Sequence, residues 1–481
     1  MLAALAVFVG SQACQPCHPA IAKSYAQTPM ARSSGSIDTI TLPPAEFTAN
    51  GHRFRIADNR LSFVVNGRDH EVAMDYFIGS AAAGRSFLFS RDRYLFEIPV
   101  TWYSRKAIWD ASPGYERNKD MQLNRAVEPS CLFCHTSRVQ PIFGTQNRYA
   151  EKPFLEDGIS CERCHGPGSE HVNDPQSPMV NPAKLKPVLR DSVCNQCHLT
   201  GEARIERAGR RMAEFRAGED LADYATYFVR SRNLTDMKVT SHVEKLAGSA
   251  CKQTSGDKLW CGTCHDVHAS DQTRVTSEKT QAACVGCHTA SHKNNARREE
   301  NCAGCHMPKS AVVDGGHGVL TDHGISTKQS HRTGDKELVA FVGVADDRAK
   351  GLAYGELGDA RARGILRRAR PVDSAVQLQL AAMEDDPHKA RALYEAVLRS
   401  NPGHTVALVN LGSLYAQMGH PEAAARLWRR ALEANPGLEE AVLNLAQVSE
   451  PATARTILTD YLGWNPSSKA VRERLRSILQ K

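Results

Sequence analysis

The chain has 481 residues, of which 41% are apolar and 6% aromatic, so it is long enough for two or three domains with a sizeable buried core. Its formal net charge is +7, from 60 basic and 53 acidic side chains. Beyond the N-terminal residues no run of 18 or more apolar residues occurs, which excludes a protein that crosses a membrane several times through helices.

Residues 1–13 are expected to be a residual or truncated signal segment. The run from Met1 to Gly10 is apolar but lacks a basic beginning, and it is too short to span a bilayer. We therefore expect the start of a complete signal peptide to lie upstream of it.

Seven Cys-x-x-Cys-His motifs run from residue 14 to residue 306. Two thiols at this spacing can form thioethers with the two vinyl groups of a haem, and the adjacent imidazole can reach its iron. Zinc also binds paired cysteines, but zinc does not require a histidine after every second cysteine. The predicted attachment cysteines are Cys14, Cys17, Cys131, Cys134, Cys161, Cys164, Cys194, Cys197, Cys261, Cys264, Cys284, Cys287, Cys302 and Cys305, and the predicted proximal ligands are His18, His135, His165, His198, His265, His288 and His306.

The motifs account for 14 of the 15 cysteines, which leaves only Cys251, so no disulfide framework is expected. Cys251 is interpreted as a free structural thiol. Each haem carries two propionates, so seven haems would change the charge of +7 by about −14, to near −7. The basic sequence therefore does not predict a nucleic-acid partner.

A β-rich insertion is predicted at about 45–110, between the first and second motifs. Apolar and polar residues alternate on both sides of Asp58-Asn59, and Asn66-Gly67 is a second hairpin signal. This small antiparallel sheet is interpreted as a packing cap over the first haem, with substrate binding as the alternative.

The region 14–325 is predicted to be one seven-haem cytochrome c domain. From residue 128 to residue 325 the motifs are separated only by Gly, Pro and short helical turns, which leaves too little chain for a separate core around each haem. Neighbouring haems are therefore expected to pack in a row. The fold class predicted for the whole chain is mainly α, with the β insertion as an exception.

Residues 326–370 are expected to be a linker with a possible helix pair, and 371–481 a helical repeat domain. The basic run Arg361, Arg363, Arg367, Arg368 and Arg370 is typical of a solvated helix face. Asn-Pro pairs end at Pro402, Pro436 and Pro466, 34 and 30 residues apart. With Leu408, Gly412, Tyr415, Ala424 and Trp428 between them, they resemble the tetratricopeptide repeat, which implies an α-helical solenoid.

The second axial ligands are expected to be mostly histidines. Outside the motifs and the repeats the chain has nine: His52, His70, His171, His242, His268, His292, His317, His323 and His331. Met30, twelve residues after His18 of the first motif, could ligate that haem through its thioether and raise its potential. The alternatives are ligation by His52 or His70, and an open sixth position.

Three segments resemble multihaem cytochromes of the group that contains the nitrification tetrahaem cytochrome and hydroxylamine oxidoreductase. They are Cys161-Glu-Arg-Cys-His-Gly-Pro-Gly-Ser-Glu-His171, Cys261-Gly-Thr-Cys-His-Asp-Val-His268 and Cys302-Ala-Gly-Cys-His-Met-Pro-Lys309 with Thr321-Asp-His323. The resemblance covers residues 11–325. It implies that His171, His242, His268, His292, His317 and His323 are distal ligands, and it leaves open which haem each one serves.

The predicted function is electron transfer by an exported seven-haem cytochrome, with the repeats docking a redox partner protein. The alternative is a multihaem oxidoreductase that acts on a nitrogen or sulfur compound at one open haem. Covalent haem attachment outside the cytoplasm places the protein in the periplasm or elsewhere beyond the inner membrane of a bacterium. The sequence identifies neither a catalytic residue nor an oligomeric state.

Overall fold

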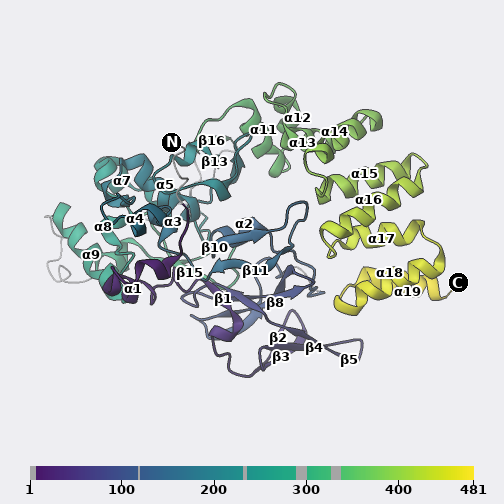
Figure 1. The fold of residues 1–481 in the computed structure, drawn as a ribbon, viewed down its shortest axis with the longest axis horizontal. Coiled ribbons are helices and arrows are strands. Elements are labelled where there is room, and N and C mark those ends of the chain that lie inside the picture. Colours follow the sequence, from purple (N-terminus) through teal and green to yellow (C-terminus); the bar gives the residue numbers. More distant parts are fainter. Residues whose placement is uncertain (1–6, 117–119, 231–235, 289–300, 327–336, 481) are drawn as a thin grey trace.

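The structure is a computed structural model and describes residues 7–116, 120–230, 236–288, 301–326 and 337–480. Figure 1 shows β-sheets formed by the N-terminal part, an adjoining part of short helices and loops, and an arc of paired helices at the C-terminal end. Its strands are β1 (Ser34–Ser36), β2 (Ala45–Ala49), β3 (His52–Ala57), β4 (Arg60–Val65), β5 (Arg68–Ala73), β6 (Tyr76–Ile78), β7 (Arg85–Arg91), β8 (Tyr94–Tyr103), β9 (Ile108–Ala111), β10 (Ser137–Pro141), β11 (Tyr149–Glu156), β12 (Ala203–Glu206), β13 (Ala225–Arg230), β14 (Lys309–Ala311), β15 (Val319–Thr321) and β16 (Leu338–Val342).

The prediction of a mainly α fold, in which a haem-packed region contains one small β insertion, is wrong. Within the described residues, 16 strands form five antiparallel sheets, and β10 to β16 all follow the β-rich stretch that the sequence predicted. These later strands are short, and some are buried on both faces, as in β13, where Ala225 to Phe228 are all buried. Such strands show no alternation of apolar and polar residues, so the sequence pattern does not reveal them.

Two sheets face each other in the N-terminal part. The four-stranded sheet has the order β2-β3-β4-β5, and the five-stranded sheet has the order β1-β6-β7-β8-β9. The turns at Asp58-Asn59 and Asn66-Gly67 link β3 to β4 and β4 to β5, and their non-glycine residues have φ between 51° and 56°, which Asn and Asp tolerate better than other side chains.

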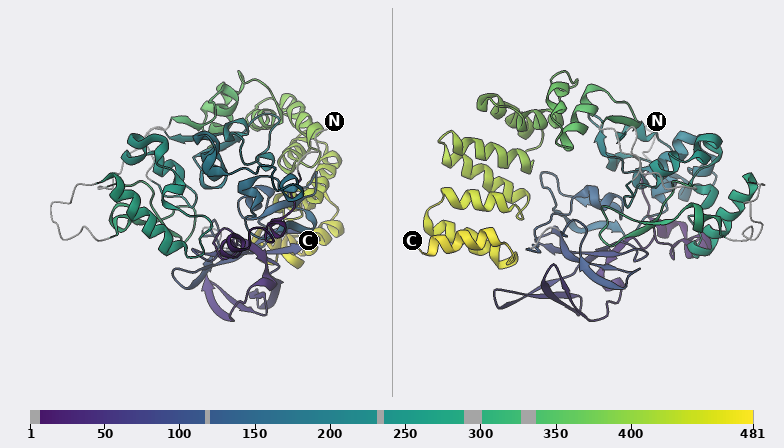
Figure 2. Two further views of the ribbon diagram at one scale, coloured as in Figure 1. Left: turned by 60° about the vertical axis from the view of Figure 1, so that its left-hand side comes forward. Right: turned by 180° about the vertical axis from the view of Figure 1, so that it is seen from behind.

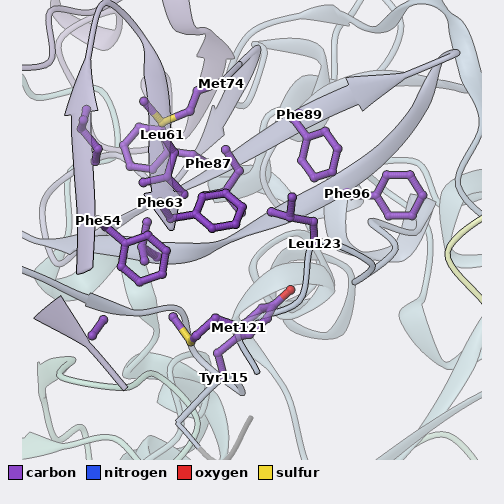
Figure 3. Close-up of a cluster of buried hydrophobic side chains, with 14 of the residues drawn as sticks. Phe54, Leu61, Phe63, Met74, Phe87, Phe89, Phe96, Tyr115, Met121 and Leu123 are labelled. Atoms are coloured by element: carbon purple, nitrogen blue, oxygen red, sulfur yellow. The ribbon is translucent and has the colours of Figure 1, made fainter. Parts of the chain in front are cut away.

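The core of this part is aromatic (Figure 3). Phe54, Leu61 and Phe63 of the four-stranded sheet and Phe87 and Phe96 of the five-stranded sheet belong to one buried cluster. Because Phe87 and Phe96 are fully buried, truncating either to alanine would cost about 3–5 kcal/mol. This packing makes the two sheets a rigid base for the segments that follow.

The region that carries the motifs consists of short helices, separated by the two- and three-stranded sheets. The pair β10-β11, the triplet β12-β13-β16 and the pair β14-β15 lie between or beside the motifs. Its helices are α1 (Pro19–Tyr25), α2 (Pro129–Phe133), α3 (Glu162–His165), α4 (Ser169–Asn173), α5 (Pro187–His198), α6 (His242–Ala247), α7 (Ala250–Ser255), α8 (Cys261–Cys264), α9 (Gln272–Cys287) and α10 (Cys302–His306).

From residue 337 onward, the segment expected to be a linker is folded. Within it, β16 pairs with β13, so residues 338–342 extend the sheet beside the motifs. The basic run that follows lies on and after α12, and three of its arginines form ion pairs, among them Arg363 with Asp385 at 2.7 Å. The C-terminal helices are α11 (Asp347–Glu356), α12 (Arg361–Leu366), α13 (Ser374–Ala382), α14 (Pro387–Ser400), α15 (Thr405–Gln417), α16 (Pro421–Ala434), α17 (Glu439–Val448), α18 (Pro451–Trp464) and α19 (Lys469–Leu479).

Consecutive helices from α13 onward pack as antiparallel pairs. In the repeat that matches the expected pattern best, the indole Nε1 of Trp428 on α16 donates to the carbonyl oxygen of Val409 on α15 at 3.2 Å. A Cβ at Gly412 would lie 2.5 Å from that Nε1, so only glycine allows α15 and α16 to approach this closely.

The arc is fastened to the sheets through its Asn-Pro turns, and Figures 1 and 2 show it beside them in every view. Asn435 donates through Nδ2 to Oε1 of Gln146 at 2.9 Å. Asn465 accepts through Oδ1 from the backbone N–H of Leu123 at 2.9 Å and donates through Nδ2 to Oε1 of Gln122 at 3.0 Å. Because Asn465 is fully buried, these turns are part of an internal interface.

Candidate haem-binding sites

The motifs adopt a common local geometry. In at least four of them the backbone N–H of the histidine donates to the carbonyl oxygen of the first cysteine, for example His265 to Cys261 at 2.9 Å and His288 to Cys284 at 2.8 Å. This single helical turn brings both thiols and the imidazole to one side of the backbone, as covalent haem attachment requires. None of the motif cysteines forms a disulfide.

Three motif histidines each face a second histidine from a remote segment. The ring centroids are 6.3 Å apart for His18 and His171, 6.0 Å for His165 and His268, and 6.1 Å for His265 and His323. The two ring planes in each pair are nearly parallel, at 13°, 17° and 23°.

These separations fit one metal ion between the two rings of a pair. A metal-bound imidazole nitrogen lies about 2 Å from its metal and the ring centroid about 1.1 Å further away, so two imidazoles on opposite sides of one ion have centroids about 6.2 Å apart. The residues present therefore fit axial ligation of haem iron by histidine pairs.

Backbone carbonyl oxygens orient these imidazoles. The Nδ1 of His171 lies 2.8 Å from the carbonyl oxygen of Ser177, that of His165 lies 2.7 Å from Val180, and that of His323 lies 3.0 Å from Thr321. A carbonyl oxygen only accepts, so each Nδ1 is the protonated nitrogen and each Nε2 keeps its lone pair. This is the arrangement in which a histidine ligates a metal through Nε2.

The ring of His242 lies beside the rings of His198 and His323. Its centroid is 5.6 Å from that of His198 and 4.7 Å from that of His323, with ring planes close to perpendicular. Burial, together with the neighbouring histidines, lowers the pKa of His242 to about 3, and burial lowers the pKa of His265 to about 4. Neutral imidazole is the form that binds a metal.

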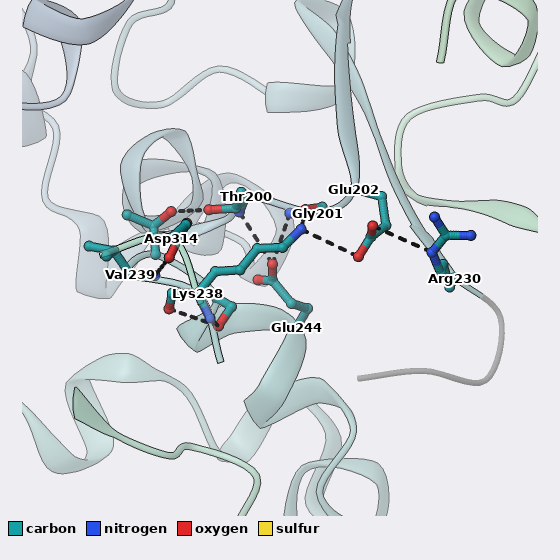
Figure 4. A network of polar contacts seen from close by, with 10 residues as sticks. Thr200, Gly201, Glu202, Arg230, Lys238, Val239, Glu244 and Asp314 are labelled. Atoms are coloured by element: carbon teal, nitrogen blue, oxygen red, sulfur yellow. Dashed lines mark hydrogen bonds and ion pairs between the residues drawn. The ribbon is translucent and has the colours of Figure 1, made fainter. Parts of the chain in front are cut away.

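A buried carboxylate holds the helix of His242 against the fourth motif (Figure 4). Glu244 accepts from the backbone N–H of Gly201 at 2.8 Å and from that of Thr200 at 3.3 Å. Lys238 adds a bond to the carbonyl oxygen of Gly201 at 2.6 Å. Since Thr200 and Gly201 lie two and three residues after His198 of the fourth motif, this network fixes His242 relative to His198.

A second buried carboxylate joins the first and third motifs. Glu162, only 2% exposed, accepts from the backbone N–H groups of Val9, Gly10 and Gly168 at 2.7 to 2.9 Å. Residues 7–13 were expected to be part of a signal remnant, and Val9 and Gly10 among them form hydrogen bonds with the folded third motif.

The sequence analysis did not identify Glu162 or Glu244 as functional residues. Glu162 lies inside a motif, but nothing in the motif spacing shows that a carboxylate is buried.

Cysteines of different motifs also meet. Thiols lie within hydrogen-bond reach of each other in four pairs, namely Cys14 with Cys161, Cys134 with Cys197, Cys194 with Cys261 and Cys284 with Cys302. Burial and the neighbouring thiol raise the pKa of Cys14 to about 11, so that thiol is protonated at neutral pH. The pairs place the first motif beside the third, the fourth beside the second and the fifth, and the sixth beside the seventh.

Other predicted ligands lie elsewhere. His317 has its Nε2 2.6 Å from a carboxylate oxygen of Asp110 and its Nδ1 3.2 Å from Nζ of Lys106. His52 and His70 contact the phenyl rings of Phe54 and Phe63 on the four-stranded sheet. His292 and His331 lie outside the described residues.

Met30 bonds through its backbone, since its carbonyl oxygen accepts from the backbone N–H of Ile159 at 3.0 Å. The residue that faces His18 of the first motif is His171.

For His135 and His288, the described residues show no ring contact with another histidine. Within the described ranges, no three or more His, Cys, Asp and Glu side chains converge as ligands of a bare ion. Nor is any helix there long and apolar enough to cross a bilayer.

Three protein families match parts of the chain. Residues 102–166 match the family of cytochrome c554 and c-prime, residues 254–293 match the doubled CXXCH motif, and residues 381–448 match the tetratricopeptide repeat. The first two matches contain four of the seven motifs, and the third covers α14 to α17.

The chain is similar to the multiheme cytochrome MtrA of Shewanella baltica (strain OS185), with 28% identity over 199 residues. That match covers 38% of this chain and 47% of the relative, so it spans about half of the relative's length. Among solved structures, the outer cell wall cytochrome OcwA matches with a TM-score of 0.44 and 13% identity over 90% of this chain and 99% of OcwA. A thermophilic tetratricopeptide-repeat protein of Thermus thermophilus matches with a TM-score of 0.24 and 18% identity over 28% of this chain and 83% of its own.

Proposed function

We propose that this chain, a multihaem c-type cytochrome with tetratricopeptide repeats at its C-terminal end, is an exported electron carrier that binds seven haems. The observation that supports this most is the set of three histidine pairs at 6.0 to 6.3 Å. A haem bound covalently with two axial imidazoles supplies a one-electron carrier with no free coordination position.

In this proposal the motif cysteines form thioethers and the motif histidines are the proximal ligands. His171 is the distal ligand at the first motif, His268 at the third and His323 at the fifth, because each faces the corresponding motif histidine. His242 is assigned to the fourth motif, because Glu244 holds it beside His198. His171 thus replaces Met30 as the ligand proposed for the first haem.

The proximity of the motifs supports electron transfer between them. Two of the four thiol pairs join motifs that are not consecutive in the sequence, so the proposed haems would be close to each other although their attachment sites are up to 147 residues apart, from Cys14 to Cys161. The protein contributes the fixed spacing, the exclusion of water by buried side chains such as Val193 and Leu199 beside the fourth motif, and the orientation of the imidazoles.

The proposed compartment follows from the chemistry of attachment. Thioether formation needs reduced thiols and takes place outside the cytoplasm, so we place the protein in the periplasm or beyond it. The redox partner is proposed to be a protein that binds the repeats on faces away from the Asn-Pro turns, since those turns already contact the sheets.

The first test is the haem count. An intact-mass measurement on protein from a host with a complete haem-attachment system should show the chain plus about 4.3 kDa, or about 0.6 kDa for each of seven haems. A smaller added mass would show that some motifs do not bind haem.

The second test separates a carrier from an oxidoreductase. Electron paramagnetic resonance of the oxidised protein should show low-spin haems, and cyanide or nitrite should leave the spectrum unchanged. His268→Ala should convert one haem to a high-spin form that binds cyanide, while the control His388→Ala, on an exposed position of α14, should change nothing. A wild-type protein with a high-spin haem that binds nitrite or hydroxylamine would favour the oxidoreductase.

A further inference from the structure

Three motifs converge through the residue that precedes their second cysteine. This residue is Phe133 in the second motif, Arg163 in the third and Gln196 in the fourth. The guanidinium carbon of Arg163 lies 4.0 Å from the centroid of the Phe133 ring, and its Nη2 donates to the carbonyl oxygen of Phe133 at 3.1 Å. Gln196 donates through Nε2 to the carbonyl oxygen of Arg163 at 3.4 Å.

The guanidinium of Arg163 is confined but only partly paired. Its Nε is buried and has no hydrogen-bond partner among the described residues. The planar group lies against an aromatic face, which holds it in place without neutralising its charge. A full positive charge is therefore fixed at the junction of three motifs.

Arg163 links the three motifs through its contacts. It belongs to the third motif, its guanidinium lies on the ring and bonds to the backbone of Phe133 in the second motif, and its own carbonyl oxygen accepts from Gln196 of the fourth motif. Its charge is therefore close to the attachment sites of all three motifs.

We propose that Arg163 is an electrostatic positioning residue that raises the reduction potentials of the haems at the second, third and fourth motifs. This inference rests on the proposed function, because it requires haems at those motifs. Oxidised haem carries one more positive charge than reduced haem, so a fixed guanidinium nearby disfavours the oxidised form. The junction then becomes the place where electrons reside longest in the partly reduced protein.

The test is a spectropotentiometric titration of the haem-loaded protein and of three variants. Arg163→Gln should lower the potentials of the haems that are reduced first. The expected effect is about a tenfold fall in their reduced-to-oxidised ratio at a fixed applied potential, which for one electron equals about 59 mV. Arg163→Lys, which keeps the charge, should shift the titration much less.

The control is Arg361→Gln, on α12 and paired with Asp359, which should leave the titration unchanged. Haem content by intact mass is measured for every variant. If Arg163→Gln titrates like the wild type, or if Arg163→Lys shifts as far as Arg163→Gln, the electrostatic role is refuted. A wild-type protein that lacks redox-active haems at these motifs would instead refute the proposed function, which the haem count shows independently.

If Arg163→Gln fails to bind haem, Phe133→Leu provides a second measurement. It removes the aromatic face but keeps the charge of Arg163 and its hydrogen bond to the backbone carbonyl oxygen at position 133, which still holds the guanidinium there, so the proposal expects potentials close to those of the wild type. A fall in potential with Phe133→Leu as large as that expected for Arg163→Gln would overturn the proposal.

Discussion

Replacing Glu162 should loosen the contact between the N-terminal segment and the third motif. Its carboxylate accepts from the N–H groups of Val9, Gly10 and Gly168 at 2.7 to 2.9 Å, and the residue is 2% exposed. Hydrogen bonds to a charged group contribute about 1.5–3 kcal/mol each, and an unpaired buried donor costs about 1–3 kcal/mol. Because residues 7–11 can become solvated after the change, we expect Glu162→Ala to cost about 3–5 kcal/mol rather than the full sum.

Glu162→Gln should cost about half as much, because the amide keeps one acceptor oxygen but turns an NH₂ group toward a backbone N–H. The matched control is Glu170→Ala, an exposed position on α4, which should change stability by at most about 0.5 kcal/mol. Guanidinium unfolding of the haem-loaded proteins, followed by far-ultraviolet circular dichroism at equal haem content, measures the differences. Equal midpoints for Glu162→Ala and Glu170→Ala would refute the reasoning.

Further predictions concern a buried acid, the arc and the first haem. Burial raises the pKa of Glu97 to about 7, so the native state holds this proton more tightly than the unfolded state, and the unfolding free energy should fall by up to about 3 kcal/mol as the pH rises from about 4.5 to about 7. Glu97→Gln should remove that part of the pH dependence in unfolding curves; an unchanged dependence would contradict it. Asn465→Ala should lower the free energy of unfolding by about 2–3 kcal/mol, because it removes bonds to Leu123 and Gln122. The control Asn401→Ala, at a side chain that bonds within its own turn, should lower it by about 1 kcal/mol or less. Equal losses would argue against a stabilising interface between the repeats and residues 122–123. Met30→Leu should leave every haem low-spin, whereas His171→Ala should produce one high-spin haem in electron paramagnetic resonance; the opposite pattern would restore Met30 as the ligand.

The parts of the protein that sequence reasoning could predict are those defined by short or regular spacing. Each Cys-x-x-Cys-His motif lies within five consecutive residues, so its capacity for haem attachment can be recognised without knowing the fold. The repeat was recognisable because Trp428 and Gly412 keep the 34-residue pattern, and residues 381–448 match that repeat family.

What the sequence did not predict depends on contacts between remote segments. The prediction of a mainly α fold failed at strands such as β13, whose buried residues show no alternation. The pairing of His18 with His171 joins positions 153 residues apart, and no spacing rule specifies such a partner. Glu162 and Glu244 were missed for a related reason, since a carboxylate is buried only when the fold brings backbone N–H groups to it.

The central claim is that this chain stores and passes electrons through seven haems, and a stoichiometric reductive titration tests it most directly. Oxidised protein of known concentration is titrated anaerobically with dithionite and then returned to the oxidised state with a small-molecule acceptor, while the visible spectrum is recorded. The account predicts that about seven electrons per chain are taken up, one for each motif, and recovered in full, with no loss of electrons to added nitrite or hydroxylamine. Uptake of fewer electrons, or their consumption by nitrite or hydroxylamine, would contradict it.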